Sequence, residues 1–421
     1  MAQPQMMRNT ATHSGVRMEV PFFRPKISEE EIAEVVDSLR SGWLTTGPKV
    51  RQFEQEFAKA IRTARCVAAN SCTAALHLAL EALGLRPGQG VLVPTMTFAA
   101  TAEVVQYLGG IPILVDCDPC TTNMSIQDAA RKLDQLKSAK FNKLVSQRVE
   151  VVGIVPVHVG GLMMDINAIK QLASEHGLWI VEDAAHAFPA AWRSSPDAPW
   201  QRCGGDTATV SCFSFYANKT ITTGEGGMAA THDEEVANHM RMMSLHGLSH
   251  DAWGRYSGTG TWDYKIMAAG FKYNLTDIAA GLGIHQLARA EQMRHNRERI
   301  ATRYLEMLGD LEAIELPPTN RNRIHAWHLF PIKLRLERLR ISRDDFVSKL
   351  RQSGVGFSVH WRPLHLHPYY QETFGWRPDN FPVATAVWER LVSLPIFPDM
   401  NDLELEYVVD TVRSLCAEHA R

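Results

Sequence analysis

One lysine in the sequence stands where an amine can react with a carbonyl group. Lys219 follows an apolar run that ends near Phe215, and it precedes Gly224, Gly226 and Gly227. Glycines of this kind let the backbone turn sharply and pass close to a ligand. Because partial burial lowers the pKa of a lysine, an amine in such a loop can be a neutral nucleophile. An isolated lysine is more often a solvated surface group, so the interpretation depends on its neighbours.

A second apolar run, residues 179–182, delivers a carboxylate to the end of a predicted strand. Pyridoxal 5'-phosphate (PLP) needs a buried carboxylate partner to keep its pyridine nitrogen protonated. Asp183 suits that task, whereas Glu182 should point to the opposite side of the strand. The alternative for Asp183 is a helix N-cap. His186, three residues on, is either a cofactor contact or a structural histidine.

Small polar residues also occur where an anion could bind. Ser71, Cys72 and Thr73 lie between a predicted strand and an apolar helix. The free amides and dipole of a helix N-terminus attract phosphate groups, although plain N-capping explains the same residues. Phe98 follows another predicted strand, where its ring could stack on a pyridine.

These motifs need elements that bring them together. Short apolar strands alternate with helical patterns between Arg65 and Met243. This alternation predicts an α/β fold with a mostly parallel sheet that is covered on both faces. Ligands bind beyond the carboxyl ends of such strands, and all the motifs fall there. A helical stretch over 276–309 should end this domain. A smaller α+β domain should follow, with strands over 327–334 and 356–360.

Length and composition agree with a two-domain soluble enzyme. The chain has 421 residues, of which 45% are apolar and 21% charged, and its net charge is -2. We expect a disordered segment over residues 1–19, a large domain over 20–300 and a small domain over 301–421. The near-neutral charge argues against a nucleic-acid partner. The first residues lack the apolar core of a signal peptide, and no apolar window suits a bilayer, so we expect a cytoplasmic enzyme.

Two patterns could in principle bind a metal ion. Cys117 and Cys120 form a C-x-x-C without a second pair, and a turn after a strand explains them better. His360, His365 and His367 form an H-x4-H-x-H on a proline-rich connection, where one histidine could instead meet substrate. We therefore predict no metal site.

Taken together and in this order, the motifs resemble the sugar aminotransferases of the DegT/StrS type. These enzymes have the aspartate-aminotransferase-like scaffold (PLP fold type I). The resemblance runs from about Val20 to Arg413. It is carried by Gly47-Pro48, Glu182–His186, Ser214–Lys219, Thr223–Gly227 and Gly270–Asp277. Within the family the chain is most similar to the UDP-4-amino-4-deoxy-L-arabinose–oxoglutarate aminotransferases, through His246–Leu248, His325–Phe330 and Ser393–Asp399.

The resemblance implies roles for single residues. Lys219 would hold PLP as a Schiff base and carry a proton, Asp183 would pair with the pyridinium, and His186 would lie near the ring. Further cofactor contacts would come from Ser71, Cys72, Thr73, Phe98 and Ser214, and from Asn274 of a neighbouring subunit. A homodimer with shared active sites follows. Substrate contacts would come from Trp43, Thr45, His246, Tyr273 and His328. Residues 249–262 are rich in glycine and aromatic residues and form either a mobile substrate loop or a plain surface loop.

The implied reaction is a ping-pong transfer of an amino group from glutamate, which leaves as 2-oxoglutarate. The acceptor would be a keto group, expected at the 4-position of a nucleotide-linked sugar. Three alternatives remain open. They are an aminotransferase of a cyclitol or other non-nucleotide ketone, a PLP-dependent sugar dehydratase, and a PLP-binding regulatory protein without turnover. Lys219 argues against dehydratases that have histidine there, and the sequence has no basic appendage that would favour a regulator.

Overall fold

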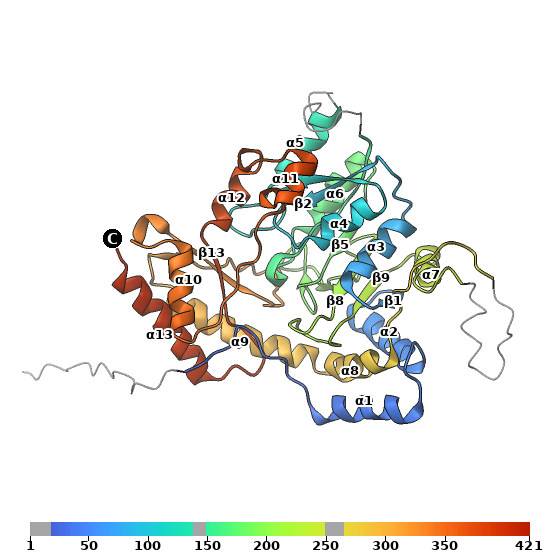
Figure 1. The fold of residues 1–421 in the computed structure, drawn as a ribbon, viewed down its shortest axis with the longest axis horizontal. Helices are drawn as coiled ribbons and strands as arrows, with labels where there is room; N and C mark the ends of the chain where they lie inside the picture. The colour runs from blue at the N-terminus through green and yellow to red at the C-terminus, as the bar shows by residue number, and fades with distance from the viewer. Residues whose placement is uncertain (1–17, 138–148, 249–264) are drawn as a thin grey trace, which may run out of the picture.

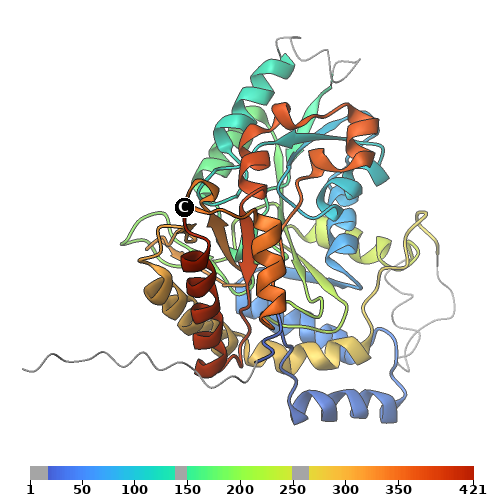
Figure 2. The same ribbon diagram turned by 60° about the vertical axis from the view of Figure 1, so that its left-hand side comes forward.

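The computed structural model describes residues 18–137, 149–248 and 265–421 (Figures 1 and 2). Residues 1–17 of the expected disordered segment and residues 249–262, the candidate substrate or surface loop, lie outside the described residues. The described helices are α1 (Glu29–Ser41), α2 (Pro48–Ile61), α3 (Cys72–Ala82), α4 (Ala100–Tyr107), α5 (Ile126–Lys137), α6 (Ile166–His176), α7 (Glu234–Met243), α8 (Asp277–Ala288), α9 (Ala290–Leu308), α10 (Arg343–Gln352), α11 (Pro368–Phe374), α12 (Pro382–Trp388) and α13 (Asp402–Glu418). None of them is both long and apolar enough to cross a membrane.

A seven-stranded sheet forms the centre of the larger part of the molecule. Its strands are β1 (Arg65–Ala69), β2 (Gly90–Pro94), β3 (Ile111–Val115), β4 (Val151–Ile154), β5 (Trp179–Asp183), β8 (Val210–Ser214) and β9 (Gly227–Thr231). Their order across the sheet is β1-β9-β8-β5-β4-β2-β3. β9 runs antiparallel to β1 and β8, and the other neighbouring pairs are parallel. The predicted mostly parallel sheet is confirmed.

Alternate residues of each strand face two separate hydrophobic cores. On β5, Ile180 belongs to a core with α2, α5, α6 and α8, whereas Val181 belongs to a core with α3, α4 and α7. Successive side chains of a strand point to opposite faces, so both faces must be apolar. Asp183 therefore projects on the α3–α4 side, and Glu182 projects on the other.

The C-terminal part contains a second, smaller sheet of antiparallel strands. It has the order β10 (Ile314–Glu315), β12 (Phe330–Leu334) and β13 (Leu391–Leu394), and it packs with α10 and α13. A third small sheet joins β11 (Arg323–Ile324), β6 (Ala191–Trp192) and β7 (Gln201–Arg202). The predicted boundary near residue 300 falls inside α9, which links the two parts in Figure 1. Met293 at its start packs in the large core, and Ile300 and Tyr304 pack in the small one.

Three local predictions differ from the structure. The helical stretch over 276–309 is divided at Arg289, which separates α8 from α9. The strand over 356–360 is reduced to isolated bridges, because the amide of Gly356 donates to Val20 and only Ser358 pairs with Ser393. α11 and α12 lie beside α5 and β2 rather than beside α10 and α13 (Figure 1). Their side chains, such as Tyr370 and Ala384, complete the α3–α4 core.

Candidate active site

Lys219 lies in a loop that β8 presents at its carboxyl end. Phe215 directly after the strand is fully buried. Its carbonyl accepts hydrogen bonds from Thr222 Oγ1 and from the amide of Thr223, and its own amide donates to the carbonyl of Gly226, which closes the loop. The pKa of Lys219 is lowered to about 8, mainly because the amine is buried; the interactions with Cys72 and Asp183 oppose this shift, and the charge of Arg297 adds to it. The amine is therefore much closer to neutrality at physiological pH than an exposed lysine is.

Asp183 ends β5 with its carboxylate buried beneath α4. Its Oδ2 accepts a hydrogen bond from Thr101 Oγ1 at 2.7 Å, and its Oδ1 accepts one from the amide of Ala185 at 3.2 Å. Burial raises the pKa of Asp183, while these hydrogen bonds and the charge of Lys219 counteract the rise. A turn, not a helix, follows the strand, so Asp183 is not a helix N-cap. It is available as the partner of a cation.

The start of α3 lies next to the first residue of β9. Ser71 caps the helix by accepting a hydrogen bond from the amide of Ala74 at 3.0 Å, so its side chain has the N-cap role, and Cys72 and Thr73 form the first turn. A Cβ atom on Gly227 would lie 2.3 Å from the carbonyl oxygen of Ser71. Glycine at 227 is thus needed for this approach. On neighbouring β8, Ser214 Oγ accepts from the amide of Tyr216.

Aromatic and imidazole rings surround Lys219. His328 Nε2 lies 3.5 Å from the amine, and its ring centre lies 4.1 Å from that of His186. His186 also stacks on Trp361, with the ring centres 5.0 Å apart. Burial lowers the pKa of both His186 and His328 well below the usual value, so both rings are neutral. Phe98, beyond the carboxyl end of β2, is 63% exposed and can cover a ligand.

Two predicted site residues, His186 and His328, thus come together with Lys219, but other predicted residues form a separate group. The side-chain amide of Asn274 donates to the hydroxyl groups of Thr46 at 2.8 Å and Thr45 at 3.4 Å. Tyr273 Oη pairs with His77 Nδ1 at 3.1 Å, and His246 is exposed. Trp43 lies on the loop that carries Thr45 and Thr46, and it is partly exposed. These residues lie on the loop around 43–47 and on the described residues near 246 and 273–274.

Sequence reasoning missed Thr101, Arg297 and Trp361, which contact or influence the site. None of the three belongs to a motif that indicates this site; the fold brings Thr101 to Asp183, Arg297 close enough to influence Lys219, and Trp361 to His186. The histidine pattern also divides. His360 lies near His186 and pairs with Ser393, whereas His365 binds Thr95 and Thr385. The three histidines therefore do not form one metal site.

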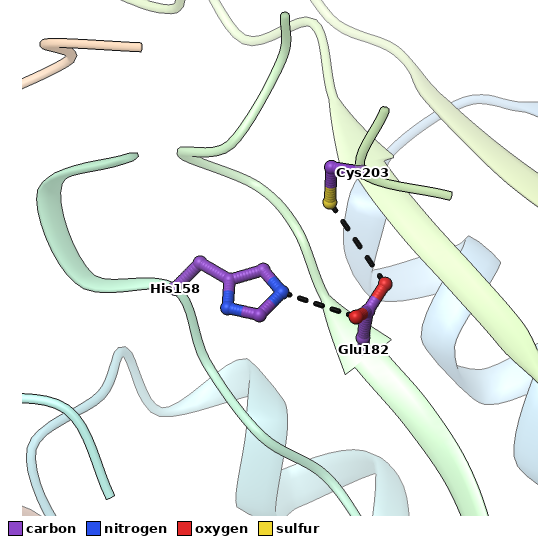
Figure 3. Close-up of side chains that lie close together, drawn as sticks. All are labelled: His158, Glu182 and Cys203. Carbon is purple, nitrogen blue, oxygen red and sulfur yellow. Dashed lines mark hydrogen bonds and ion pairs between the residues drawn. The ribbon is translucent and has the colours of Figure 1, made fainter. Parts of the chain in front are cut away.

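A different buried group has potential metal ligands within reach of one another. The side chains of His158, Glu182 and Cys203 meet on the face of β5 opposite Asp183, and their potential ligand atoms lie within 4.8 Å of one another (Figure 3). However, His158 Nδ1 accepts a hydrogen bond from the amide of Met164. The ring proton then sits on Nε2, which faces Glu182 Oε1 at 3.2 Å and has no lone pair for a metal. The three side chains are therefore better explained as a hydrogen-bonded cluster around Glu182 of β5 than as a metal centre.

The hydrogen bonds of this cluster keep Glu182 ionised. Its Oε2 accepts hydrogen bonds from Thr207 and Ser211, both at 2.6 Å. Burial opposes ionisation, but His158 and these hydroxyl groups lower the pKa of Glu182. The two neighbouring carboxylates thus have separate tasks, because Glu182 fixes the strand and Asp183 faces the site.

The arrangement fits PLP. A buried amine of lowered pKa can bind the aldehyde, Asp183 can pair with the ring nitrogen, and the start of α3 suits the phosphate. An exposed aromatic ring at Phe98 can cover the pyridine. All four groups lie at or just beyond the carboxyl ends of parallel strands of the large sheet, as expected for a ligand site on such a sheet.

Comparison with known proteins identifies the family. Residues 25–413 match the DegT/DnrJ/EryC1/StrS aminotransferase family. The chain is 40% identical to spore coat polysaccharide biosynthesis protein SpsC of Bacillus subtilis over 94% of its length and 97% of SpsC.

Solved structures agree with this match. The PLP form of the putative sugar aminotransferase Spr1654 from Streptococcus pneumoniae is 29% identical, with a TM-score of 0.83 over 95% of this chain and 99% of that one. DesV of S. venezuelae, solved with a ketimine intermediate, is 30% identical, with a TM-score of 0.82 over 94% of this chain and 98% of that one. The expected fold type and enzyme class are confirmed, and the chain belongs to the DegT/DnrJ/EryC1/StrS aminotransferase family.

Proposed function

We propose that this aminotransferase uses PLP on Lys219 to move an amino group from glutamate to a keto group of a nucleotide-linked sugar. The observation that carries the proposal is the pairing, at one sheet edge, of a buried amine whose pKa is about 8 with the buried carboxylate of Asp183. Sugar aminotransferases among the solved relatives, and SpsC in polysaccharide biosynthesis, support the substrate class.

When bound, PLP supplies the electron sink that makes an α-proton removable. Asp183 holds the proton on the ring nitrogen, because a buried carboxylate stabilises a neighbouring cation. Lys219 would hold the cofactor, and once glutamate has displaced this lysine, its neutral amine would take the α-proton and return it one carbon away. Addition of water would then release 2-oxoglutarate and leave the amino group behind, which ends the first half of a ping-pong cycle. The ketone substrate is then aminated by the same proton transfers in reverse.

The acceptor side is proposed from the family resemblance and the loops near the site. A 4-keto group is the proposed acceptor, with Trp43, Thr45, His246, Tyr273 and His328 as contacts. The proposed enzyme acts in the cytoplasm as a homodimer, and Asn274 of each subunit reaches the phosphate in the other. The exposed rings of Phe98 and Tyr216 beside the site support a covering partner.

The purified protein should show the visible absorption of PLP bound to a lysine. Glutamate should bleach this band with release of 2-oxoglutarate, and UDP-, dTDP- or GDP-linked 4-keto sugars should restore it. The Lys219→Ala variant should lose this half-reaction by at least about a hundredfold, because a placed proton carrier is worth that much or more.

A Lys219→Ala variant with wild-type turnover would refute the catalytic assignment. Discharge by glutamine but not by glutamate would refute the donor. Restoration of the band only by cyclitol or other free ketones would refute the nucleotide-sugar acceptor.

A further inference from the structure

His328 approaches the Lys219 amine from the C-terminal part of the chain. Its Nε2 lies 3.5 Å from Nζ of Lys219, and only 4% of its surface is exposed. This distance is long for a hydrogen bond, but hydrogen bonds of catalytic groups are often long before substrate binds. His328 lies between β11 and β12, and Lys219 lies after β8. The contact between them is therefore made by the tertiary fold and not by neighbours in the sequence.

The backbone that carries His328 is tightly held. Trp327 has a φ of 49°, a left-handed conformation that is unfavourable for a bulky residue. Its amide donates to His325 Nδ1 at 2.8 Å, and the two rings stack with centres 3.9 Å apart. Such conformations persist only where the surroundings determine them.

Arg297 supplies the second restraint on this turn. Its buried guanidinium donates to the carbonyl groups of Trp327 at 3.3 Å, His328 at 3.4 Å and Ile396 at 2.7 Å. Because α9 carries Arg297, the helix that links the two parts of the molecule also fixes the orientation of His328.

The direction of the contact follows from the chemistry of the two groups. Burial keeps the His328 ring neutral, and a neutral imidazole has one donor and one acceptor nitrogen. Its Nδ1 is buried without a hydrogen-bond partner among the described residues. The amine of Lys219 bears N–H groups whether it is neutral or charged. The charged amine has no lone pair and can only donate, so the one assignment that serves both of its states has an acceptor lone pair on Nε2 and the ring proton on Nδ1.

We propose that His328 is a positioning residue that accepts a hydrogen bond from the freed amine of Lys219 and thereby aims the amine's lone pair at the reacting carbon. This inference rests on the proposed role of Lys219. The lone pair of Nζ takes the α-proton as the C–H bond breaks, which gives an ammonium group. His328 stays neutral, and its hydrogen bond strengthens because the donor is now charged. The ammonium then gives up the same proton at the second carbon.

Two substitutions separate this role from simple packing. His328→Phe keeps a ring of similar size but has no acceptor, whereas His328→Gln keeps an acceptor on a side chain of similar reach. His365→Phe is the matched control, because His365 is also fully buried but binds Thr95 and Thr385 instead. Each variant is studied by single turnover with glutamate and with α-deuterated glutamate. The uptake of PLP by the full-length apoprotein is followed across the pH range around 8.

His328→Phe should slow the glutamate half-reaction by about ten- to a hundredfold, because a misaligned group costs that much. The α-deuterium isotope effect should grow, and glutamate affinity should stay within about threefold. PLP uptake needs the neutral amine, so its rate rises with pH through the pKa of Lys219. Loss of the acceptor destabilises the ammonium, which moves this rise to lower pH. His328→Gln should restore part of both effects.

Several results would overturn the positioning role. One is a wild-type isotope effect and pH profile in His328→Phe. Another is an equal slowing in the Phe and Gln variants, or in the His365→Phe control. Weaker glutamate binding with an unchanged rate at saturation would make His328 a substrate contact only. A wild-type protein that glutamate does not discharge would refute the proposed function instead.

Discussion

At the scale of single residues, the two neighbouring carboxylates of β5 differ in task. Asp183→Asn should leave PLP bound through Lys219 but slow the glutamate half-reaction on the order of a hundred- to a thousandfold, because a neutral amide does not hold a proton on the ring nitrogen. Single-turnover absorbance with glutamate measures this. Glu182→Gln is the matched control, since its side chain lies on the opposite face.

The control should lose stability rather than chemistry. Glu182→Gln removes the charge that His158, Thr207 and Ser211 bind, which should cost about 1–3 kcal/mol in the free energy of unfolding. Denaturant titration measures that loss. If Glu182→Gln slowed the folded enzyme as much as Asp183→Asn, the assignment of Asp183 would be wrong.

Sequence reasoning was informative for residues that end a strand and uninformative for residues that the tertiary fold delivers. The positions of Lys219 and Asp183 could be predicted, because an apolar run in the sequence indicates the strand that ends at or shortly before each of them. The opposite direction of Glu182 followed from strand geometry alone. Arg297 and Trp361 could not be predicted, because a helix arginine or a loop tryptophan carries no local signal of what it meets.

At the scale of elements, the close approach of β9 to α3 depends on one glycine. Gly227→Ala would place a Cβ 2.3 Å from the carbonyl oxygen of Ser71 and 2.6 Å from the amide nitrogen of Cys72. Because both are backbone atoms, the start of α3 must move. We expect PLP affinity to fall by about tenfold or more and stability to fall by about 1–3 kcal/mol. Equilibrium dialysis of PLP and denaturant titration measure the two effects.

Gly177→Ala is the control for this glycine substitution. Gly177 ends α6 with a φ of 65°, and a Cβ there would meet nothing within 4 Å. The left-handed backbone alone should cost about 1 kcal/mol, with PLP affinity unchanged. Unchanged PLP affinity in Gly227→Ala would show that the start of α3 does not hold the cofactor.

The elements themselves were largely predictable where apolar periodicity was clear. The predicted alternation of strands and helices runs from Arg65 at the start of β1 to Met243 at the end of α7. The segment 356–360 was not, because its alternation resembles a strand while its backbone hydrogen bonds go partly to Val20 near the N-terminus. The packing of α11 and α12 on the large sheet was also not predictable, since short helices after prolines do not indicate which core they join.

At the scale of the whole molecule, the proposed homodimer makes a prediction that one chain alone cannot satisfy. In this proposal each site takes Lys219 from one subunit and Asn274 from the other. The Asn274→Ala variant should bind PLP weakly, and the Lys219→Ala variant should lack the Schiff base, so neither should turn over well. Mixed dimers differ, because the subunit that keeps Lys219 receives an intact Asn274 from its partner.

Unfolding and refolding an equimolar mixture of the two variants should therefore restore activity to about a quarter of the wild-type level, since half of randomly formed dimers are mixed and each has one complete site. Sedimentation analysis confirms that dimers form, and single-turnover absorbance counts competent sites. In the structure Asn274 binds Thr45 and Thr46 of its own chain. If that contact served its own subunit's site, the Lys219-bearing subunit would keep its defect and mixing would restore nothing. Restored activity thus requires that Asn274 cross the interface.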